Sequence, residues 1–423
     1  MSTAADQPDK SNATGAAGGE TSPFTWLALI ALVYLLLVGV GLISEGFKWI
    51  SGGAEGAQAI FAFASNPIVG VILGTLATAL VQSSSTVTAV IVGLVAGGAP
   101  VAAAIPMIMG ANMGTTITNT IVSLGGFAER KTFNRSFQAA TVHDFFNLYS
   151  ILLFLPIEIF FHPLERLAGA AAQLFTGAGN ASVSGYNVLD AAIDPPVEGF
   201  MALIGGLSRI PGGSISIVVG ISCVIGSVLY LGKILRKVMT GKAKALVDKS
   251  IGRGPVSGVV SGTVITVLVQ SSSTSTSLIV PLAGAGTLSL RQVYPYTLGA
   301  NIGTCVTALL AATAVVGANS VFALQIALVH LLYNVIGVIL FLAVPWVKDL
   351  PIRSAQWLGN RVEHNRSWAF GYIAGVFFAM PGAVFAGEVL LRGPAPVMAQ
   401  ATVEEASGGA IEESAEQFEF AIE

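Results

Sequence analysis

Charged side chains are scarce in this chain of 423 residues: only 10% are Asp, Glu, Lys or Arg, whereas 53% are hydrophobic. Soluble globular proteins carry about 25% charged residues. No charged residue occurs in 56–128 or 292–347, and such runs can hold several spans of about 20 apolar residues each. The runs also lack the apolar–polar alternation of membrane barrel strands. The composition excludes an ordinary soluble domain and predicts an all-α polytopic membrane protein.

Cysteine and histidine are also rare. The two cysteines, Cys223 and Cys305, fall in apolar segments, so no structural disulfide and no metal-ligand spacing is expected. The four histidines form no zinc-type cluster in the sequence. We expect no cofactor. An intramembrane serine enzyme is disfavoured because no lysine lies in the core to act as the base. Nothing in the sequence supports nucleic-acid binding, whereas the basic segment 233–253 suits contact with anionic lipid headgroups.

The apolar segments predict seven membrane spans and two longer, interrupted segments. The N-terminal residues 1–23 are rich in Ser, Ala and Gly and are interpreted as a disordered tail, not a signal peptide. The expected spans are 24–43, 100–124, 136–157, 213–232, 292–315, 321–345 and 367–391.

Two further apolar segments, 67–98 and 255–287, are interrupted near the middle by the same cluster, QSSST. Their arms are shorter than the length of about 20 residues that a crossing requires. We expect two re-entrant hairpins of half-helices, since irregular backbone at membrane depth is tolerated where it is buried or lines a cavity. The alternative is one long tilted helix with a polar stripe.

Charge in the connecting segments predicts the orientation. Basic residues are concentrated in 130–135, 233–253 and 346–366, which the positive-inside rule places in the cytoplasm. The linker 158–212 has more acidic residues and is expected outside the cell. The acidic C-terminal tail 392–423 would then also lie outside.

Three motifs recur in the same order at nearly one offset. Gly74–Thr86 matches Gly262–Thr274 at 10 of 13 positions, Gly110–Thr118 matches Gly299–Thr307, and Val142-His143 with Asn147 matches Val329-His330 with Asn334. The chain therefore contains two repeats, 24–157 and 213–345, followed by a loop and last helix at 346–391. Because each repeat holds three full crossings, the second is expected to be inverted, an architecture of secondary transporters.

The polar clusters indicate ion binding. A half-helix that begins at Ser83–Thr86 exposes backbone N–H groups that suit an oxyanion without any basic residue, and the preceding half-helix leaves carbonyl oxygens for a hard cation. The Asn-x-Gly-Thr motifs are expected to break or kink their spans at Gly114 and Gly303. The oxygens expected there to suit Na⁺ belong to Asn112, Thr115, Thr118, Asn301, Thr304 and Thr307. The alternative is that these small and hydroxylated residues serve helix packing.

Asp144 is the only acidic residue well inside an expected core span, and Leu331 occupies the equivalent position in the second repeat. An intramembrane acid is by default a functional-site hypothesis, which predicts a cation site present once. The alternative is a carboxylate paired with His143, Arg135 or a backbone group. His143 and His330 are themselves interpreted as hydrogen-bonded interior histidines.

The two QSSS motifs, the GANxGT motifs and "ATVHDFFN" resemble the type II sodium–phosphate cotransporter family over roughly 65–381. The resemblance implies Na⁺-coupled uptake of inorganic phosphate. It implies a phosphate site at the two tips, formed by Gln82, Ser83, Ser84, Ser85, Gln270, Ser271, Ser272 and Ser273. It implies one Na⁺ at Gln270, Ser271, Thr304 and Thr307, another near Thr120, Glu129 and Asn147, and an extra Na⁺ at Asp144, hence three Na⁺ per divalent phosphate.

The chain departs from the vertebrate pattern of that family in three places. Its outer loop is short and lacks a cysteine pair, Gly126 stands where a polar residue is usual, and the C-terminal tail is short. These features suggest a bacterial member in the inner membrane. Alternatives are a carrier of another oxyanion or a dicarboxylate, and an ion channel with the hairpins as pore loops.

Overall fold

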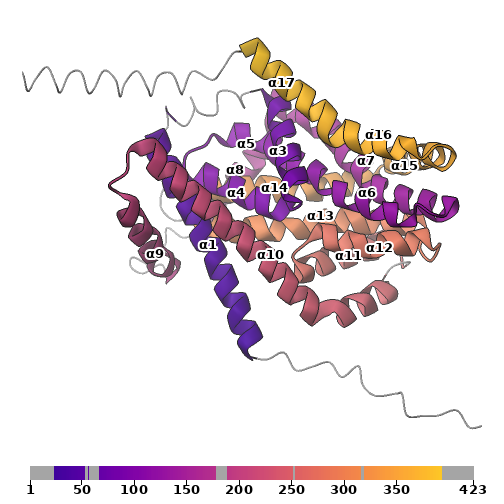
Figure 1. Ribbon diagram of the computed structural model, residues 1–423, viewed down its shortest axis with the longest axis horizontal. Helices are drawn as coiled ribbons and strands as arrows, with labels where there is room; N and C mark the ends of the chain where they lie inside the picture. Colours follow the sequence, from indigo (N-terminus) through magenta and orange to yellow (C-terminus); the bar gives the residue numbers. More distant parts are fainter. Residues whose placement is uncertain are drawn as a thin grey trace, which may run out of the picture.

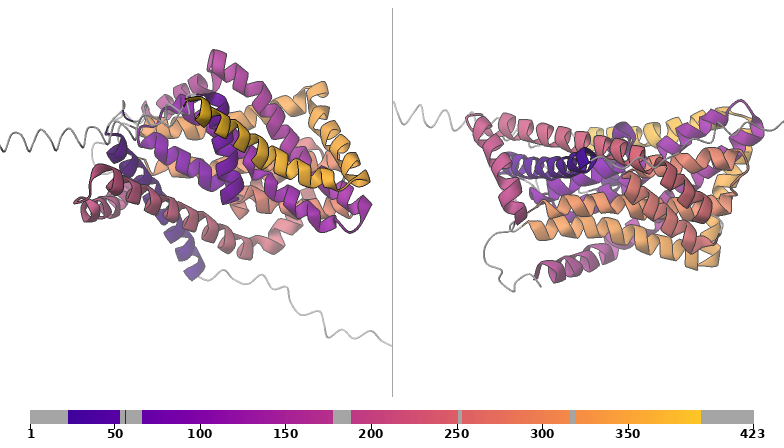
Figure 2. Two further views of the ribbon diagram at one scale, coloured as in Figure 1. Left: turned by 45° about the horizontal axis from the view of Figure 1, so that its top comes forward. Right: turned by 90° about the horizontal axis from the view of Figure 1, so that it is seen from below.

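The computed structural model describes residues 23–52, 56, 66–177, 188–250, 253–315 and 319–392. Within these ranges every regular element is a helix and there is no strand. Both expected tails, 1–23 and 392–423, fall almost entirely outside the described residues. Figure 1 labels the helices, and Figure 2 shows the long ones running roughly alongside one another.

The first half of the chain forms α1 (Pro23–Ser51), α3 (Pro67–Val81), α4 (Ser84–Ala96), α5 (Val101–Thr115), α6 (Ile117–Ser123), the 3-10 turn η3 (Leu124–Gly126) and α7 (Arg130–Phe161). The linker forms α8 (Pro163–Gly177) and α9 (Val188–Ile204). The second half forms α10 (Arg209–Ser250), α11 (Pro255–Val269), α12 (Ser272–Gly284), α13 (Leu290–Thr313) and α14 (Ser320–Ala343). The remainder forms α15 (Pro345–His364), α16 (Ser367–Ala374), the π-helix η5 (Gly375–Ala379) and α17 (Met380–Arg392).

Six helical stretches of the described residues are long and apolar enough to cross a membrane. They are Pro23–Ser51, Val101–Gly126, Arg130–Phe161, Arg209–Leu235, Ser320–Ala343 and Ser367–Glu388. They coincide with six of the seven expected spans, which confirms a polytopic all-α membrane protein. The seventh, 292–315, forms the single helix α13 but is more polar than these six.

Two segments expected to be loops are helical. The basic segment 233–253 is largely the continuation of α10, which runs without interruption to Ser250. The segment 346–366 forms α15, because its apolar residues recur at helical spacing and lie buried: Val347, Ile352, Ala355, Leu358 and Val362. The expectation of loops was wrong for both segments, because a high content of charged residues does not prevent a helix.

The two halves pack closely against each other, and α1 and α10 are the one matching pair in extensive contact among the described residues. Glycines let α1 and α10 approach closely: a Cβ on Gly39 would lie 2.9 Å from the Gly220 carbonyl oxygen, and one on Gly220 would lie 2.6 Å from the Gly39 oxygen. Such small-residue contacts are typical of helix pairs in membranes. Further in, α4 packs against α13 and α14, while α12 packs against α6 and α7. Helices of both halves therefore line the interior of the protein.

The expected break in the Asn-x-Gly-Thr motif occurs in one half only. In the first half α5 ends at Thr115 and α6 begins at Ile117. In the second half α13 continues past Gly303, so the expected break is wrong there. A Cβ on Gly303 would lie 2.7 Å from the Thr266 Cβ, so this glycine serves the close approach of α13 to α11.

Candidate functional site

Both QSSST clusters lie at a helix interruption with the same backbone. α3 ends at Val81 and α4 begins at Ser84, and Gln82 between them has φ 59°, ψ 25°. α11 ends at Val269 and α12 begins at Ser272, with Gln270 at φ 53°, ψ 30°. The alternative of one continuous helix is therefore excluded. A left-handed conformation at a residue other than glycine costs about 1–3 kcal/mol, and such strain persists at positions where the surroundings over-determine it.

The two glutamine side chains hold these turns in matching ways. Gln82 donates from Nε2 to the Ala79 carbonyl (2.5 Å) and accepts at Oε1 from the Thr118 hydroxyl (2.8 Å). Gln270 donates to the Val267 carbonyl (2.7 Å) and accepts from the Thr307 hydroxyl (3.0 Å). Each glutamine thus satisfies a carbonyl at the end of one helix and fixes a hydroxyl of the helix opposite.

The serines that follow cap and begin the next helices. Ser83 Oγ accepts from the Thr86 N–H (3.3 Å), and Ser271 Oγ accepts from the Thr274 N–H (3.2 Å). The next two serines of each cluster are buried in the first helical turn: Ser84, Ser85, Ser272 and Ser273. Each tip therefore combines hydroxyl groups with the positive end of a helix dipole, which is chemistry that favours an anion.

Buried threonines line the helices beside the tips. Thr115 and Thr304 both donate to carbonyls of their own helices, Ala111 and Ala300, at 3.0 Å. Thr78 of α3 and Thr266 of α11 occupy equivalent positions in the two repeats, and their hydroxyls are buried with no hydrogen-bond partner among the described residues. Buried polar atoms are nearly always paired, so two matching exceptions mark both copies of this region as having spare oxygen acceptors.

Behind the tips, four asparagines and two histidines connect the repeats; we call these six residues the amide–imidazole interlock. Asn112 donates from Nδ2 to Asn334 Oδ1 (2.8 Å), and the reciprocal pair has Asn301 donating to Asn147 Oδ1 (2.8 Å). All four asparagines are at most 2% exposed. The paired residues are 222 and 154 positions apart, so the interlock joins α5 to α14 and α13 to α7.

The histidines complete each pair. Because Asn112 and Asn301 use their amide nitrogens for asparagine, their oxygens must accept. His330 therefore donates from Nε2 to Asn112 Oδ1 (3.1 Å), and His143 donates from Nε2 to Asn301 Oδ1 (2.6 Å). The interlock assigns the Nε2–H tautomer to both rings and confirms that both histidines are hydrogen-bonded in the interior.

One half of the interlock extends to the second tip. Asn119 contacts His143 Nδ1 through its amide nitrogen (3.5 Å) and accepts from the Thr276 hydroxyl (2.6 Å), which lies on α12. His330 Nδ1 has no such partner among the described residues. The asparagine–asparagine and histidine–asparagine contacts are therefore the same in both halves of the interlock, whereas the contact at histidine Nδ1 is present in only one.

Asp144 is fully buried and receives two hydroxyl groups at the same oxygen. The Tyr372 hydroxyl donates to Oδ2 at 2.9 Å and the Thr120 hydroxyl at 3.2 Å. Oδ1 is buried without a hydrogen-bond partner among the described residues. Both of these hydrogen bonds come from hydroxyl groups and neither comes from His143 or Arg135, the side chains named in the alternative. A carboxylate with one free oxygen in this setting is an acceptor that suits a cation.

Glu129 and a group around Glu158 lie outside this arrangement. Glu129 is exposed at the start of α7 and accepts from the Thr132 hydroxyl at 2.7 Å, so it is not brought together with the buried residues. Glu158, His162 and Glu165 have ligand atoms within 4.8 Å of one another, a group that sequence spacing did not indicate. Glu158 is engaged as a helix cap, since it accepts from the N–H groups of Leu164 (2.8 Å) and Glu165 (2.9 Å).

Sequence reasoning missed Tyr372, Asn119 and Thr276. Tyr372 lies outside both repeats, so the internal comparison carried no signal for it. Asn119 has no polar counterpart in the second repeat, where Ala308 stands at the equivalent position. Only the packing of α12 against α6 brings Thr276 to it.

Comparison with known proteins gives one family. The profile described as Na⁺/Pi-cotransporter matches residues 35–179 and 224–353. The chain is 32% identical over 428 residues to sodium-dependent phosphate transport protein 2A of Ovis aries, covering 84% of this chain and 66% of that protein. It is 30% identical over 445 residues to protein 2B of Homo sapiens, covering 85% and 64% respectively. This chain thus spans slightly under two thirds of these relatives. No solved structure matches.

Proposed function

Because this chain belongs to the Na⁺/Pi-cotransporter family, we propose that it is a secondary active transporter that carries inorganic phosphate together with Na⁺. The observation that carries the proposal is the pair of matching interruptions, in which Gln82 and Gln270 share one strained conformation and one bonding pattern. A duplicated strained turn that faces buried hydroxyls is typical of a binding site. The names of the relatives supply the solutes, sodium and phosphate.

We propose that α3–α4 and α11–α12 are re-entrant hairpins. α3 and α11 have 15 residues each, and α4 and α12 have 13 each. At about 1.5 Å per residue such helices are roughly 20–22 Å long, shorter than the hydrocarbon core of about 30 Å. With three full crossings per repeat, 24–157 and 213–345 would have opposite orientations, with 158–212 outside the cell and 346–366 in the cytoplasm. This arrangement gives alternating access around two facing tips.

We propose that phosphate binds between the N-termini of α4 and α12. The hydroxyl and N–H donors of both serine clusters would face it from opposite sides, and no basic residue is required. The eight residues assigned to phosphate are Gln82, Ser83, Ser84, Ser85, Gln270, Ser271, Ser272 and Ser273. Bound Na⁺ would supply the compensating positive charge.

We propose Na⁺ sites beside each tip and at Asp144. The glutamine oxygens, with Thr115 and Thr118 in one copy and Thr304 and Thr307 in the other, supply oxygen ligands. The free Oδ1 of Asp144, with Thr120 nearby, supplies the third site. Asn112, Asn147 and Asn301 are engaged in the interlock, so we assign them to holding the sites in place. Glu129 is exposed next to the segment 130–135, which this orientation places in the cytoplasm, so we assign it to contact with the ion on the side of release.

With Asp144 occupied, we propose three Na⁺ for each HPO₄²⁻ and one net positive charge per cycle. Moving that charge through 100 mV contributes about 2.3 kcal/mol. Since 1.4 kcal/mol corresponds to about tenfold, the attainable accumulation rises roughly 50-fold. The membrane potential therefore becomes part of the driving force only if the third ion is carried.

The test is uptake of radiolabelled phosphate into proteoliposomes with an imposed Na⁺ gradient, with and without a set membrane potential. We expect saturable, Na⁺-dependent uptake that an inside-negative potential accelerates, with competition by arsenate but not by sulfate or succinate. Competition by sulfate or succinate would favour a carrier of other anions, and non-saturating flux without counterflow would favour a channel. Asp144→Gly should retain uptake and lose the phosphate-driven current; an unchanged current would contradict the third site.

A further inference from the structure

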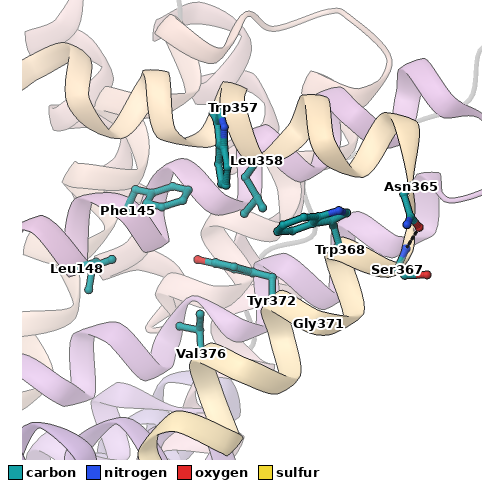
Figure 3. A pocket seen from close by; sticks show the side chains of 10 residues that line it. All are labelled: Phe145, Leu148, Trp357, Leu358, Asn365, Ser367, Trp368, Gly371, Tyr372 and Val376. Atoms are coloured by element: carbon teal, nitrogen blue, oxygen red, sulfur yellow. Dashed lines mark hydrogen bonds between the residues drawn. The ribbon is translucent and has the colours of Figure 1, made fainter.

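An apolar groove lies between α15, α16 and α7, beside the proposed third ion site (Figure 3). Its volume is about 570 Å³, within the range of roughly 300–1,000 Å³ typical of small-molecule sites. Phe145 and Leu148 of α7 form one side, Trp357 of α15 another, and Trp368, Tyr372 and Val376 the third. We propose that the groove binds one acyl chain of an anionic phospholipid, whose headgroup is held by Arg361 and Arg366.

The position of the groove in the membrane argues for a lipid. α16, η5 and α17 together form the candidate span Ser367–Glu388, of which only 18% is buried within the chain. A groove beside such a lipid-facing helix is open to the hydrocarbon phase. Trp357 and Trp368 meet edge to face at 6.2 Å at one end of the groove, and tryptophan is enriched at the membrane–water interface. The groove thus extends from the interface into the hydrocarbon.

Charge at the same end identifies the headgroup. The Arg361 guanidinium lies over the Trp357 ring at 5.6 Å, and the Arg366 guanidinium lies over the Phe127 ring at 4.5 Å. Within the described part of the chain neither guanidinium takes part in an ion pair. Two arginines without carboxylate partners, next to an apolar groove at the interface, complement a phosphate-bearing lipid that adds a further negative charge.

Two glycines of the candidate span Ser367–Glu388 allow the groove to be tested by substitution. Gly371 lines it, and a Cβ built there meets no atom within 4 Å. A leucine at this position would therefore begin in open space and reduce the room in the groove. Gly382, on α17 of the same span, is equally open and does not line the groove, so it offers a matched control.

The occupant would contact the ring of Tyr372, whose hydroxyl donates to Asp144. A filled groove would hold that ring in place and thereby hold the carboxylate. This consequence rests on the proposed function, because its test compares the Na⁺ dependence of phosphate uptake in anionic vesicles with that in zwitterionic vesicles. Lipid binding itself does not rest on it.

The direct test uses the full chain in phosphatidylcholine vesicles with a small fraction of phosphatidylglycerol that carries a photoactivatable diazirine in one acyl chain. We expect labelled peptides from α7 and α16 by mass spectrometry, loss of that labelling in Gly371→Leu, and unchanged labelling in Gly382→Leu. Unlabelled phosphatidylglycerol should compete better than phosphatidylcholine, and Arg361→Gln and Arg366→Gln should each reduce that preference about fivefold.

Three results would overturn the proposal. They are equal labelling in Gly371→Leu and wild type, equal competition by the zwitterionic lipid, and chain-to-chain cross-links that show a second copy in the groove. Thermal unfolding of both leucine variants checks that they are folded. If labelling behaves as expected but the wild-type protein does not transport phosphate, the lipid site stands and the proposed function fails. If the wild-type protein transports phosphate but labelling does not depend on Gly371, the proposed function stands and the lipid site fails.

Discussion

Replacing Asn112 with alanine should destabilise the protein mainly through the two groups it leaves behind. The substitution removes the acceptor of His330 Nε2–H and the donor to Asn334 Oδ1, both fully or almost fully buried. Each stranded buried group costs about 1–3 kcal/mol. We therefore expect the free energy of unfolding to fall by about 2–6 kcal/mol. This change in the free energy of unfolding includes the cost of leaving His330 and Asn334 without partners. It therefore does not equal the energy of the hydrogen bonds in the interlock.

A double-mutant cycle separates the two contributions. Asn112→Ala and Asn334→Ala, singly and together, should give a coupling energy of about 0.6 kcal/mol and at most about 1.7 kcal/mol, the range measured for hydrogen bonds between membrane helices. The measurement is the free energy of unfolding in lipid bicelles of constant composition. The control cycle pairs Asn112→Ala with Ser222→Ala, because the Ser222 hydroxyl donates to the Val218 carbonyl of its own helix.

The reasoning is refuted by a coupling energy for Asn112 and Asn334 no larger than that of the control cycle, which should be additive within about 0.3–0.5 kcal/mol. Repeating the cycle with and without Na⁺ adds a second criterion. A structural interlock should give the same coupling in both conditions, whereas a large Na⁺ dependence would show that Asn112 is an ion ligand.

Three further outcomes are expected. Tyr372→Phe keeps the ring but loses a bond to the Asp144 carboxylate, so unfolding should become easier by about 1.5–3 kcal/mol and the Na⁺ concentration for half-maximal uptake should shift; unchanged values would exclude the bond. Gln270→Gly and Gln270→Ala should both abolish uptake, but the glycine variant should be more stable by about 1 kcal/mol in thermal unfolding because glycine relieves the left-handed strain; equal stabilities would argue against the strain. Gly303→Ala should cost about 1–3 kcal/mol by overpacking, with Gly371→Ala, which meets open space, as the nearly neutral comparison.

Much of the architecture follows from the sequence because polar residues inside apolar runs have few interpretations. The QSSST clusters predicted interruptions at Gln82 and Gln270, and both are observed. The apolar runs likewise predicted six of the membrane-length helices. Where charge and periodicity competed, as in α15, the helical period of its buried face prevailed over its loop-like composition.

The contacts within the candidate site could not be read in the same way. The repeats showed that Asn112 corresponds to Asn301 and Asn147 to Asn334, but not that each bonds across to the other half. That pairing depends on how α5 lies against α14 and α13 against α7, which sequence spacing does not encode. Tyr372 was missed for a related reason, because no repeat partner drew attention to it.

The position of Asp144 has a consequence for how such a protein can diverge. Its hydroxyl partners come from α6 and from α16, an element outside the duplicated unit, and the second repeat offers only Leu331 at the matching place. If both tips bind one substrate, as proposed, their side chains are constrained together, whereas the carboxylate and its tyrosine have no such counterpart. Under the proposed function, a lineage could therefore gain or lose electrical coupling by changing one side chain, while its choice of solute passes unaltered from parent to descendant.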